Sequence, residues 1–112
     1  MGNPPARPDF DLTAMQAHAG EAAKLLKALA NERRLQVLCL LAGGERTFGE
    51  LDEMLDLSQS ALSQHLAVLR EEGLVQTRRE AQMIFYSLVP GPAGEVMGTL
   101  YGIYCAPKGR GA

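Results

Sequence analysis

The sequence predicts a mainly α-helical domain that carries one β-hairpin. Three features support this fold class: apolar residues recur at helical spacing through most of the chain, two short β-prone segments follow Gly73, and Pro92 begins another stretch that suits a helix. The chain has 112 residues, of which 46% are apolar and 21% are charged. This length suits one domain with a core of its own and is too short for two.

The net charge and the lengths of the apolar runs limit the classes of protein to which this chain can belong. Eleven Lys and Arg against 13 Asp and Glu give a net charge of −2, so any attraction to a polyanion has to come from a local group of cations. The apolar runs fall short of the roughly 20 residues that cross a bilayer. The first ten residues hold three prolines and no apolar signal segment. We therefore expect a cytoplasmic protein that does not bind a membrane.

Both ends are expected to lie outside the folded domain. The first ten residues have no hydrophobic periodicity, and Pro107 ends the last predicted helix. The sequence thus predicts a disordered N-terminal arm over 1–12, a folded domain over 13–106 and a flexible tail over 107–112.

The first two helices are predicted from their caps and apolar faces. Thr13 and Gln16 form a capping box for a helix over about 13–29, and its apolar stripe consists of Met15, Ala19, Ala22, Leu26 and Leu29. Asn31 can cap a second helix, which Gly43-Gly44 ends. One face of this second helix holds Leu35, Leu38, Cys39 and Ala42. The side chain of Cys39 is therefore expected to point inward or partly inward.

Two short helices follow. Thr47 and Glu50 form a capping box for a third helix that runs to about Leu55, and Ser58 caps a fourth helix, which Gly73 ends. The predicted buried face of the fourth helix consists of Leu62, Leu66 and Leu69. Its opposite face carries Ser60, Ser63, Gln64 and Ala67. That exposed face is small, uncharged and rich in hydrogen-bonding groups.

A hairpin and a final helix complete the domain. Segments 74–79 and 83–88 are β-prone and are separated by Glu80-Ala81-Gln82. Pro92 suits the first turn of a helix over about 92–105. The element order is therefore α-α-α-α-β-β-α. Two short helices followed by a hairpin with arginines match a winged helix-turn-helix.

Three glycines of the last helix, Gly94, Gly98 and Gly102, recur every fourth residue. Each costs about 1 kcal/mol relative to alanine in a helix interior. Apolar residues lie alongside them: Val96, Met97, Leu100 and Ile103. Close packing against another helix would offset the cost; without such packing the helix would fray in the monomer.

A winged helix-turn-helix places one helix in the major groove of DNA, where hydroxyl and amide groups can donate to and accept from base edges. The candidates for base contact are Ser60, Ser63 and Gln64, with Gln59 or His65 as further candidates, and Ser58 at the start of the helix is also expected to contact DNA. The candidates in the hairpin, which would meet the backbone or the minor groove, are Arg78, Arg79 and Gln82. The plainer alternative is that these residues form only the solvated face of an amphipathic helix.

Several segments resemble the ArsR/SmtB family of bacterial repressors. They are LKALANERRL (26–35), GELD (49–52), LSQSALSQHL (57–66), LREEGLV (69–75) and IFYSL (84–88). The similarity covers about residues 22–105. Within the family the chain is most similar to the dithiol branch of HlyU-like, BigR-like and SqrR-like regulators, because Cys39 lies in the second helix and Cys105 closes the last one.

The resemblance implies a symmetric homodimer that binds double-stranded operator DNA, with the first and last helices at the interface. Many relatives bind metal through a Cys-x-Cys pair, but Thr47 and Gly49 stand at those positions. Others use Asp and His on the last helix, where this chain has only the carboxylate of Glu95. We therefore expect no metal and no cofactor. The signal would be an oxidant or reactive sulfur species that bridges Cys39 and Cys105 and so releases the operator.

Other functions stay open at the level of sequence. The two cysteines lie 66 residues apart (105 − 39), which excludes a C-x-x-C motif, and each could be a small buried hydrophobe. The chain could be a thiol-switched antirepressor that displaces another DNA-binding protein, or a dimeric interaction module without DNA binding. A sulfur-transfer enzyme with Cys39 as nucleophile is disfavoured, because no His/Asp partner pattern accompanies the cysteine. We therefore do not expect an enzyme.

Overall fold

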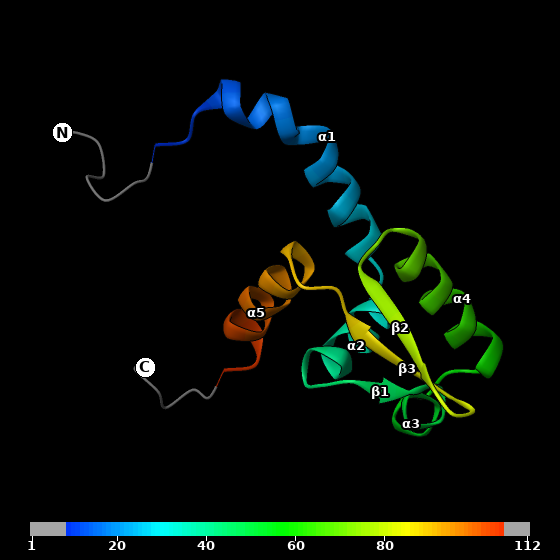
Figure 1. The fold of residues 1–112 in the computed structure, drawn as a ribbon. Helices are drawn as coiled ribbons and strands as arrows, with labels where there is room; N and C mark the ends of the chain where they lie inside the picture. The colour runs from blue at the N-terminus through cyan, green and yellow to red at the C-terminus, as the bar shows by residue number, and fades with distance from the viewer. Residues whose placement is uncertain (1–8, 107–112) are drawn as a thin grey trace.

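Five helices and a three-stranded sheet make up residues 9–106, which are the residues described by the structure, a computed structural model. The expectations for 1–8 and 107–112 lie outside the described residues. The elements are α1 Leu12–Leu29, α2 Glu32–Ala42, β1 Arg46–Thr47, α3 Phe48–Met54, α4 Gln59–Glu71, β2 Val75–Glu80, β3 Met83–Leu88 and α5 Pro92–Tyr104 (Figure 1). Their order confirms the predicted arrangement of helices and hairpin, with one strand added.

Helix α1 begins one residue before the predicted start and has a different cap. Oδ1 of Asp11 accepts hydrogen bonds from the backbone N–H groups of Thr13, at 2.9 Å, and Ala14, at 3.4 Å. The predicted capping box of Thr13 and Gln16 is therefore wrong. A carboxylate at the N-cap satisfies the free N–H groups and also interacts favourably with the positive end of the helix dipole.

The N-terminal part of α1 stands away from the rest of the chain (Figure 1). Only Ala28 and Leu29 of this helix are buried, whereas Met15 is 57% exposed and Leu26 is 56% exposed. Most of the predicted apolar stripe therefore has no partner within residues 9–106. The C-terminal end of α1 is fixed to α2, because Nε of Arg34 donates to the carbonyl oxygen of Ala28 at 2.6 Å.

The caps predicted for the next three helices are confirmed. Oδ1 of Asn31 accepts from two backbone N–H groups at the start of α2. Thr47 and Glu50 form a reciprocal capping box at α3, and Oγ of Ser58 accepts from the backbone of α4. Gly73 follows α4 with φ 75°, a left-handed conformation that glycine adopts without steric cost.

The core is built mainly from leucines of α2, α3 and α4, with contributions from α1, β2 and α5. It consists of Leu29, Val37, Leu38, Leu41, Leu51, Leu62, Leu66, Leu69, Val75 and Met97. The buried face predicted for α4 is confirmed. Full burial of each such side chain contributes about 1.5–3 kcal/mol to folding, so this face holds α4 firmly and leaves its other face exposed.

The sheet has the strand order β1-β3-β2, and both strand pairs are antiparallel. The hairpin of β2 and β3, here called the wing, runs over 75–88. Its strands begin and end near the predicted bounds, but β2 continues through Glu80 and leaves a two-residue turn in which Ala81 has φ 56°. Strand β1 was not predicted. It has only two residues, and its pairing with Phe85 and Tyr86 spans about 40 positions of sequence.

Helix α5 begins at Pro92 as predicted and packs against α2. Ala93 and Met97 are its buried residues. A Cβ built on Gly94, Gly98 or Gly102 would meet no atom within 4 Å. A side chain at these three positions would therefore point into open space in the described part of this chain. No helix within residues 9–106 combines the length and apolar character needed to cross a bilayer.

Candidate nucleic-acid interface

Helix α4 presents an uncharged polar surface on the side opposite its buried leucines. Ser60, Ser63, Gln64 and Ala67 are all exposed, as predicted. The helix lies at the outer edge of the molecule, next to the wing (Figure 1). The arrangement leaves hydroxyl and amide groups free to meet a ligand as large as a duplex.

The first two candidates of the recognition helix are already engaged within the protein. Oγ of Ser58 accepts from the backbone N–H of Ala61 at 3.1 Å and lies 3.4 Å from Oγ of Ser60. Nε2 of Gln59 donates to Oδ2 of Asp52 at 3.1 Å. Sequence reasoning missed Asp52, because nothing in the spacing of α3 and α4 indicates which of their polar side chains meet.

His65 differs from its neighbours on α4 because it is only half exposed. Burial lowers the pKa of its imidazole below the ordinary 6.5, and the positive charges of Arg34 and Arg33 lower the pKa further. The neutral form is therefore favoured. Because its side chain is less exposed than those of Ser63 and Gln64, His65 is a weaker candidate for base contact than either.

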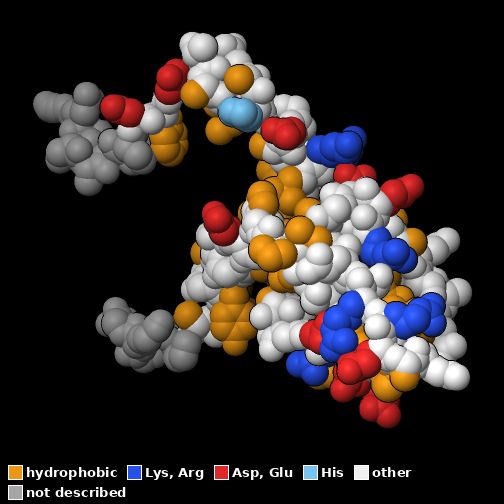
Figure 2. Space-filling model, viewed as in Figure 1, with side chains coloured by type: hydrophobic (Ala, Val, Ile, Leu, Met, Phe, Trp, Pro, Cys, Tyr) orange, Lys and Arg blue, Asp and Glu red, His pale blue; other side chains and the backbone are white. Residues whose placement is uncertain are grey.

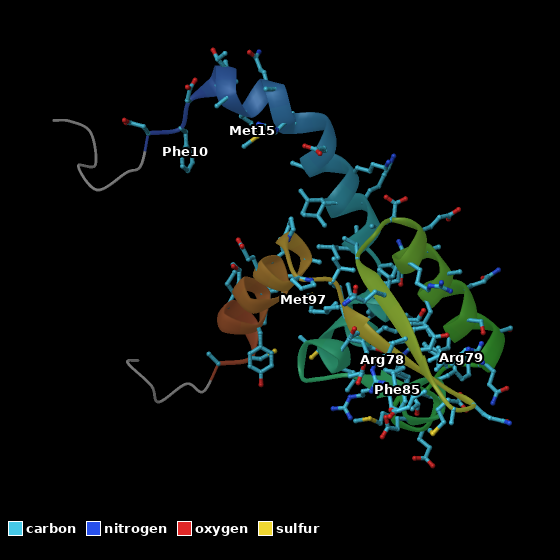
Figure 3. The ribbon with its side chains drawn as sticks, in the orientation of Figure 1. Phe10, Met15, Arg78, Arg79, Phe85 and Met97 are labelled. Carbon is cyan, nitrogen blue, oxygen red and sulfur yellow. The ribbon has the colours of Figure 1, made fainter. Side chains whose placement is uncertain are left out.

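Arg78, the first wing candidate, is held by carboxylates on both sides. Its Nε and Nη2 donate to the two carboxylate oxygens of Glu45 at 2.7 and 2.9 Å, and its Nη1 donates to Glu80 at 3.1 Å. Its guanidinium also lies 4.4 Å from the ring centre of Phe85 (Figure 3). These hydrogen bonds raise the pKa of Arg78 and lower the pKa of Glu45.

Arg79 is the freer cation of the wing. It is exposed, and no hydrogen bond or ion pair joins it to another of the described residues. Gln82 is exposed in the hairpin turn. Figure 2 shows cationic (blue) and acidic (red) side chains interleaved over this end of the molecule. The predicted basic wing is thus a surface of both signs, in which Arg79 and Arg78 differ in their availability.

Cys39 and Cys105 are both free thiols with exposed side chains. The predicted inward or partly inward orientation of Cys39 is wrong. Val37, Leu38 and Leu41 form the buried face of α2, and a step of one residue along a helix turns the side chain by about 100°, which carries Cys39 out of the core. Cys105 is the C-cap of α5, and its backbone N–H donates to the carbonyl of Tyr101 at 2.8 Å.

The described residues hold no group of three or more His, Cys, Asp and Glu side chains placed to bind a metal ion. Thr47, at a position where relatives were expected to carry a metal-binding cysteine, uses its hydroxyl to cap α3.

Comparison with known proteins decides the family. Residues 31–77 match the family model described as "Bacterial regulatory protein, arsR family". The transcriptional activator HlyU of Vibrio cholerae serotype O1 is 52% identical over 96 residues, which cover 86% of this chain and 89% of that protein. The chain belongs to the ArsR family.

Two further comparisons place the chain within the ArsR family. The biofilm growth-associated repressor of Agrobacterium fabrum is 50% identical over 100 residues, which cover 89% of this chain and 86% of that protein. The solved structure of reduced HlyU from Vibrio cholerae N16961 matches with a TM-score of 0.78 and 52% identity, over 83% of this chain and 98% of that one. The chain is thus a transcriptional regulator of the HlyU/BigR type and not an enzyme. The predicted winged-helix fold is confirmed.

Proposed function

We propose that this regulator is a homodimeric repressor that binds operator DNA through α4 and the wing, and that bridging Cys39 to Cys105 releases the operator. The observation that carries the proposal is the exposed row of uncharged hydrogen-bonding side chains on α4, next to the free cation of Arg79. The absence of acidic groups among Ser60, Ser63, Gln64 and Ala67 suits a helix face that must approach phosphates and base edges together.

The residues of α4 and those of the wing would make different kinds of contact with DNA. Ser60 and Ser63 can donate and accept hydrogen bonds, and the amide of Gln64 can bind adenine with two hydrogen bonds at its N6 and N7. Arg79 and Gln82 in the wing would contact the sugar-phosphate backbone or the minor groove. Sequence preference then comes from α4, and the wing contributes affinity that depends on salt.

A second copy of the chain is the partner that the exposed apolar residues favour. Phe10 is 83% exposed and Tyr104 is 79% exposed. Apolar side chains (orange) gather along the edge formed by α1 and α5, on the side opposite to the wing (Figure 2). Phe10, just before α1, and Met15, in the first turn of α1, lie away from the other helices (Figure 3). A two-fold dimer through α1 and α5 would bury these surfaces and present two α4 helices to successive major grooves.

Both thiols are exposed and free, so an oxidant or a persulfide can reach each of them. An oxidant takes two electrons from the pair, and two protons leave as the Sγ–Sγ bond forms. With an organic persulfide RSSH, one thiolate attacks the sulfane sulfur and expels the thiol RSH, which leaves Cys–S–SH. The other thiolate then attacks the inner sulfur of this group and expels HS⁻. Either route ends in the same disulfide.

The positions of the two cysteines support an effect on DNA binding. Cys39 lies on α2, which packs against α4 and β3, and Cys105 ends α5, which packs against α2 and belongs to the proposed dimer interface. A covalent link between them would constrain one part against the other. Release of an operator requires a bias of about 2–3 kcal/mol, which is roughly 30-fold to 150-fold in affinity and lies within usual coupling energies.

The direction of regulation separates two versions of the proposal. One relative is named a transcriptional activator and another a repressor. A regulator that raises transcription could act as an antirepressor, displacing another DNA-binding protein from the same site. Both versions require operator binding by α4 and the wing, and they differ in what the bound protein excludes from DNA.

A mobility-shift experiment with the DNA upstream of the protein's own gene tests the proposal. The reduced protein should bind this DNA in preference to an unrelated duplex of equal length. Treatment with an organic persulfide or an oxidant should weaken binding, and mass spectrometry should detect a link between Cys39 and Cys105 within one protomer. Equal affinity for both duplexes, or undiminished binding by linked protein, would overturn the corresponding part of the proposal.

A further inference from the structure

We propose that Arg78 is a positioning residue that fixes the wing to the C-terminal end of α2, and that it acts through Glu45 and does not contact DNA itself. The inference rests on the proposed function, because the orientation of the wing matters only if the wing meets DNA. Arg78 and Arg79, which are adjacent and look equivalent in the sequence, then have different roles. Glu45, although acidic, then supports the binding of a polyanion.

The contact between Arg78 and Glu45 joins segments that lie 33 residues apart in sequence. Arg78 stands in the middle of β2, and Glu45 lies in the loop between α2 and β1. Two guanidinium nitrogens meet the two oxygens of one carboxylate, at 2.7 and 2.9 Å. Isolated surface ion pairs contribute little, but two-point pairing of Arg with a carboxylate fixes direction as well as distance. The ring of Phe85 supports the guanidinium at 4.4 Å.

Glu45 can serve as an anchor because the loop around it is itself fixed. The next residue, Arg46, donates from Nε to the carbonyl oxygen of Leu40 in α2 at 3.3 Å. Arg46 also begins β1, where it pairs with Tyr86 of β3. The carboxylate of Glu45 is therefore held between α2 and the sheet. Its contact with Arg78 fixes β2, the outer strand of the wing, to the same point.

The charges around Arg78 argue against a contact with phosphate. Glu45 and Glu80 both accept hydrogen bonds from its guanidinium, so the local field that a phosphate would meet is not that of a free cation. Arg79, one residue later, has no such partners among the described residues. If Arg78 left its carboxylates to bind a phosphate, the two carboxylates would remain unpaired near the DNA backbone.

The two possible roles of Arg78 predict opposite effects of Glu45→Gln. If Arg78 binds phosphate, this substitution frees the arginine and removes a negative charge, so operator binding becomes tighter and more dependent on salt. If Arg78 positions the wing, the same substitution loosens the wing, so binding weakens although the protein has become less acidic. The sign of the change therefore distinguishes the two roles.

The test measures operator affinity by fluorescence anisotropy, with reduced full-length protein at several salt concentrations. We expect Glu45→Gln and Arg78→Gln each to weaken binding about fivefold or more, with similar magnitudes. The double variant should be no weaker than either single variant, because both remove one shared contact. The salt slope should stay unchanged in Arg78→Gln and fall by about one in Arg79→Gln.

Two further variants control for effects of unfolding and of lost positive charge. Glu80→Gln removes a carboxylate from the same guanidinium but leaves the tie to the loop, so its affinity should equal or exceed that of the unaltered protein. Arg78→Lys keeps the positive charge without the two-point geometry, so it should bind as weakly as Arg78→Gln. In the absence of DNA, hydrogen exchange should become faster in the wing of Glu45→Gln and Arg78→Gln and stay slow in the core of α4.

The outcomes separate this inference from the proposed function. Tighter binding by Glu45→Gln, or full affinity in Arg78→Lys, would overturn the positioning role while operator binding by the unaltered protein stands. Failure of the unaltered reduced protein to bind its operator would overturn the proposed function, and the positioning role would fall with it.

Discussion

The side-chain amide of Gln59 donates a hydrogen bond to the carboxylate of Asp52 over 3.1 Å, and so the first residue of α4 is tied to α3. The donating end of this amide is used inside the protein. Gln64, one and a half turns further along the helix, has no hydrogen-bond partner among the described residues and is exposed. Two glutamines of the same short helix therefore have different expected roles.

Replacing Ser63 or Gln64 with Ala should weaken operator binding by about 1–3 kcal/mol and relax the preference for operator over unrelated DNA, because a base contact is lost. Gln59→Ala is the matched control: it should lower the thermal stability of the helix-turn-helix and leave sequence preference nearly intact. Competition binding against operators with single base changes measures the preference. Unchanged operator affinity in both Ser63→Ala and Gln64→Ala would contradict the assignment of α4 as the recognition helix.

Arg79→Gln should weaken binding to operator DNA and to unrelated DNA by the same factor. It should also lower the salt slope of binding by about one, since one phosphate contact disappears. Titrations at four or more salt concentrations on both duplexes give the slope. A loss confined to operator DNA would indicate that Arg79 reads bases instead.

The thiol switch depends on both cysteines. Cys39→Ser and Cys105→Ser should each bind operator like the unaltered reduced protein, because both side chains are exposed and neither fills the core. Neither variant should release DNA after treatment with persulfide or oxidant. If one serine variant still dissociates normally, the bridge is not the cause of release, and the cysteine in question has no sensing role.

The glycine stripe of α5 allows a test of the proposed dimer. A Cβ at Gly98 meets no atom within 4 Å in the single chain, so Gly98→Ala should stabilise an isolated α5 by about 1 kcal/mol. If the stripe packs closely against a partner, Gly98→Leu should instead weaken the dimer, because its side chain is forced into a contact shaped for the backbone. Sedimentation equilibrium measures association. A dimer of unchanged strength in Gly98→Leu would remove the stripe from the interface.

His65 should make stability depend on pH below neutrality. Burial and the charges of Arg34 and Arg33 lower the pKa of the folded imidazole below 6.5, so the unfolded chain takes up a proton more readily than the folded chain. The resulting contribution to stability is complete above pH 6.5 and is lost as the pH falls through the lowered pKa. Melting temperatures from pH 7.5 to pH 5 should fall less in His65→Gln than in the unaltered protein. An identical pH profile in the two proteins would contradict the lowered pKa.

The sequence by itself determined the helices, the wing and the orientation of α4. These features are local: Asn31, Thr47 and Ser58 cap helices with their own side chains, and Gly73 supplies a left-handed stop. The leucines of α4 recur at helical spacing between polar residues, so their pattern specifies one buried face and therefore one exposed face. The family resemblance rests on these same segments.

Only the tertiary structure decided which polar groups are free. The second helix is apolar almost all round from Leu35 to Leu41, so its pattern did not specify a buried face, and packing against α4 and α5 turned Cys39 outward. The contacts of Arg78 with Glu45 and of Gln59 with Asp52 join different elements, and β1 pairs with a strand about 40 residues away. Spacing along a chain fixes neighbours within one helix or strand. Contacts between elements depend on how all of them pack together, and therefore only the folded chain shows that Arg78 is hydrogen-bonded to Glu45 and Glu80, whereas Arg79 has no such partner among the described residues.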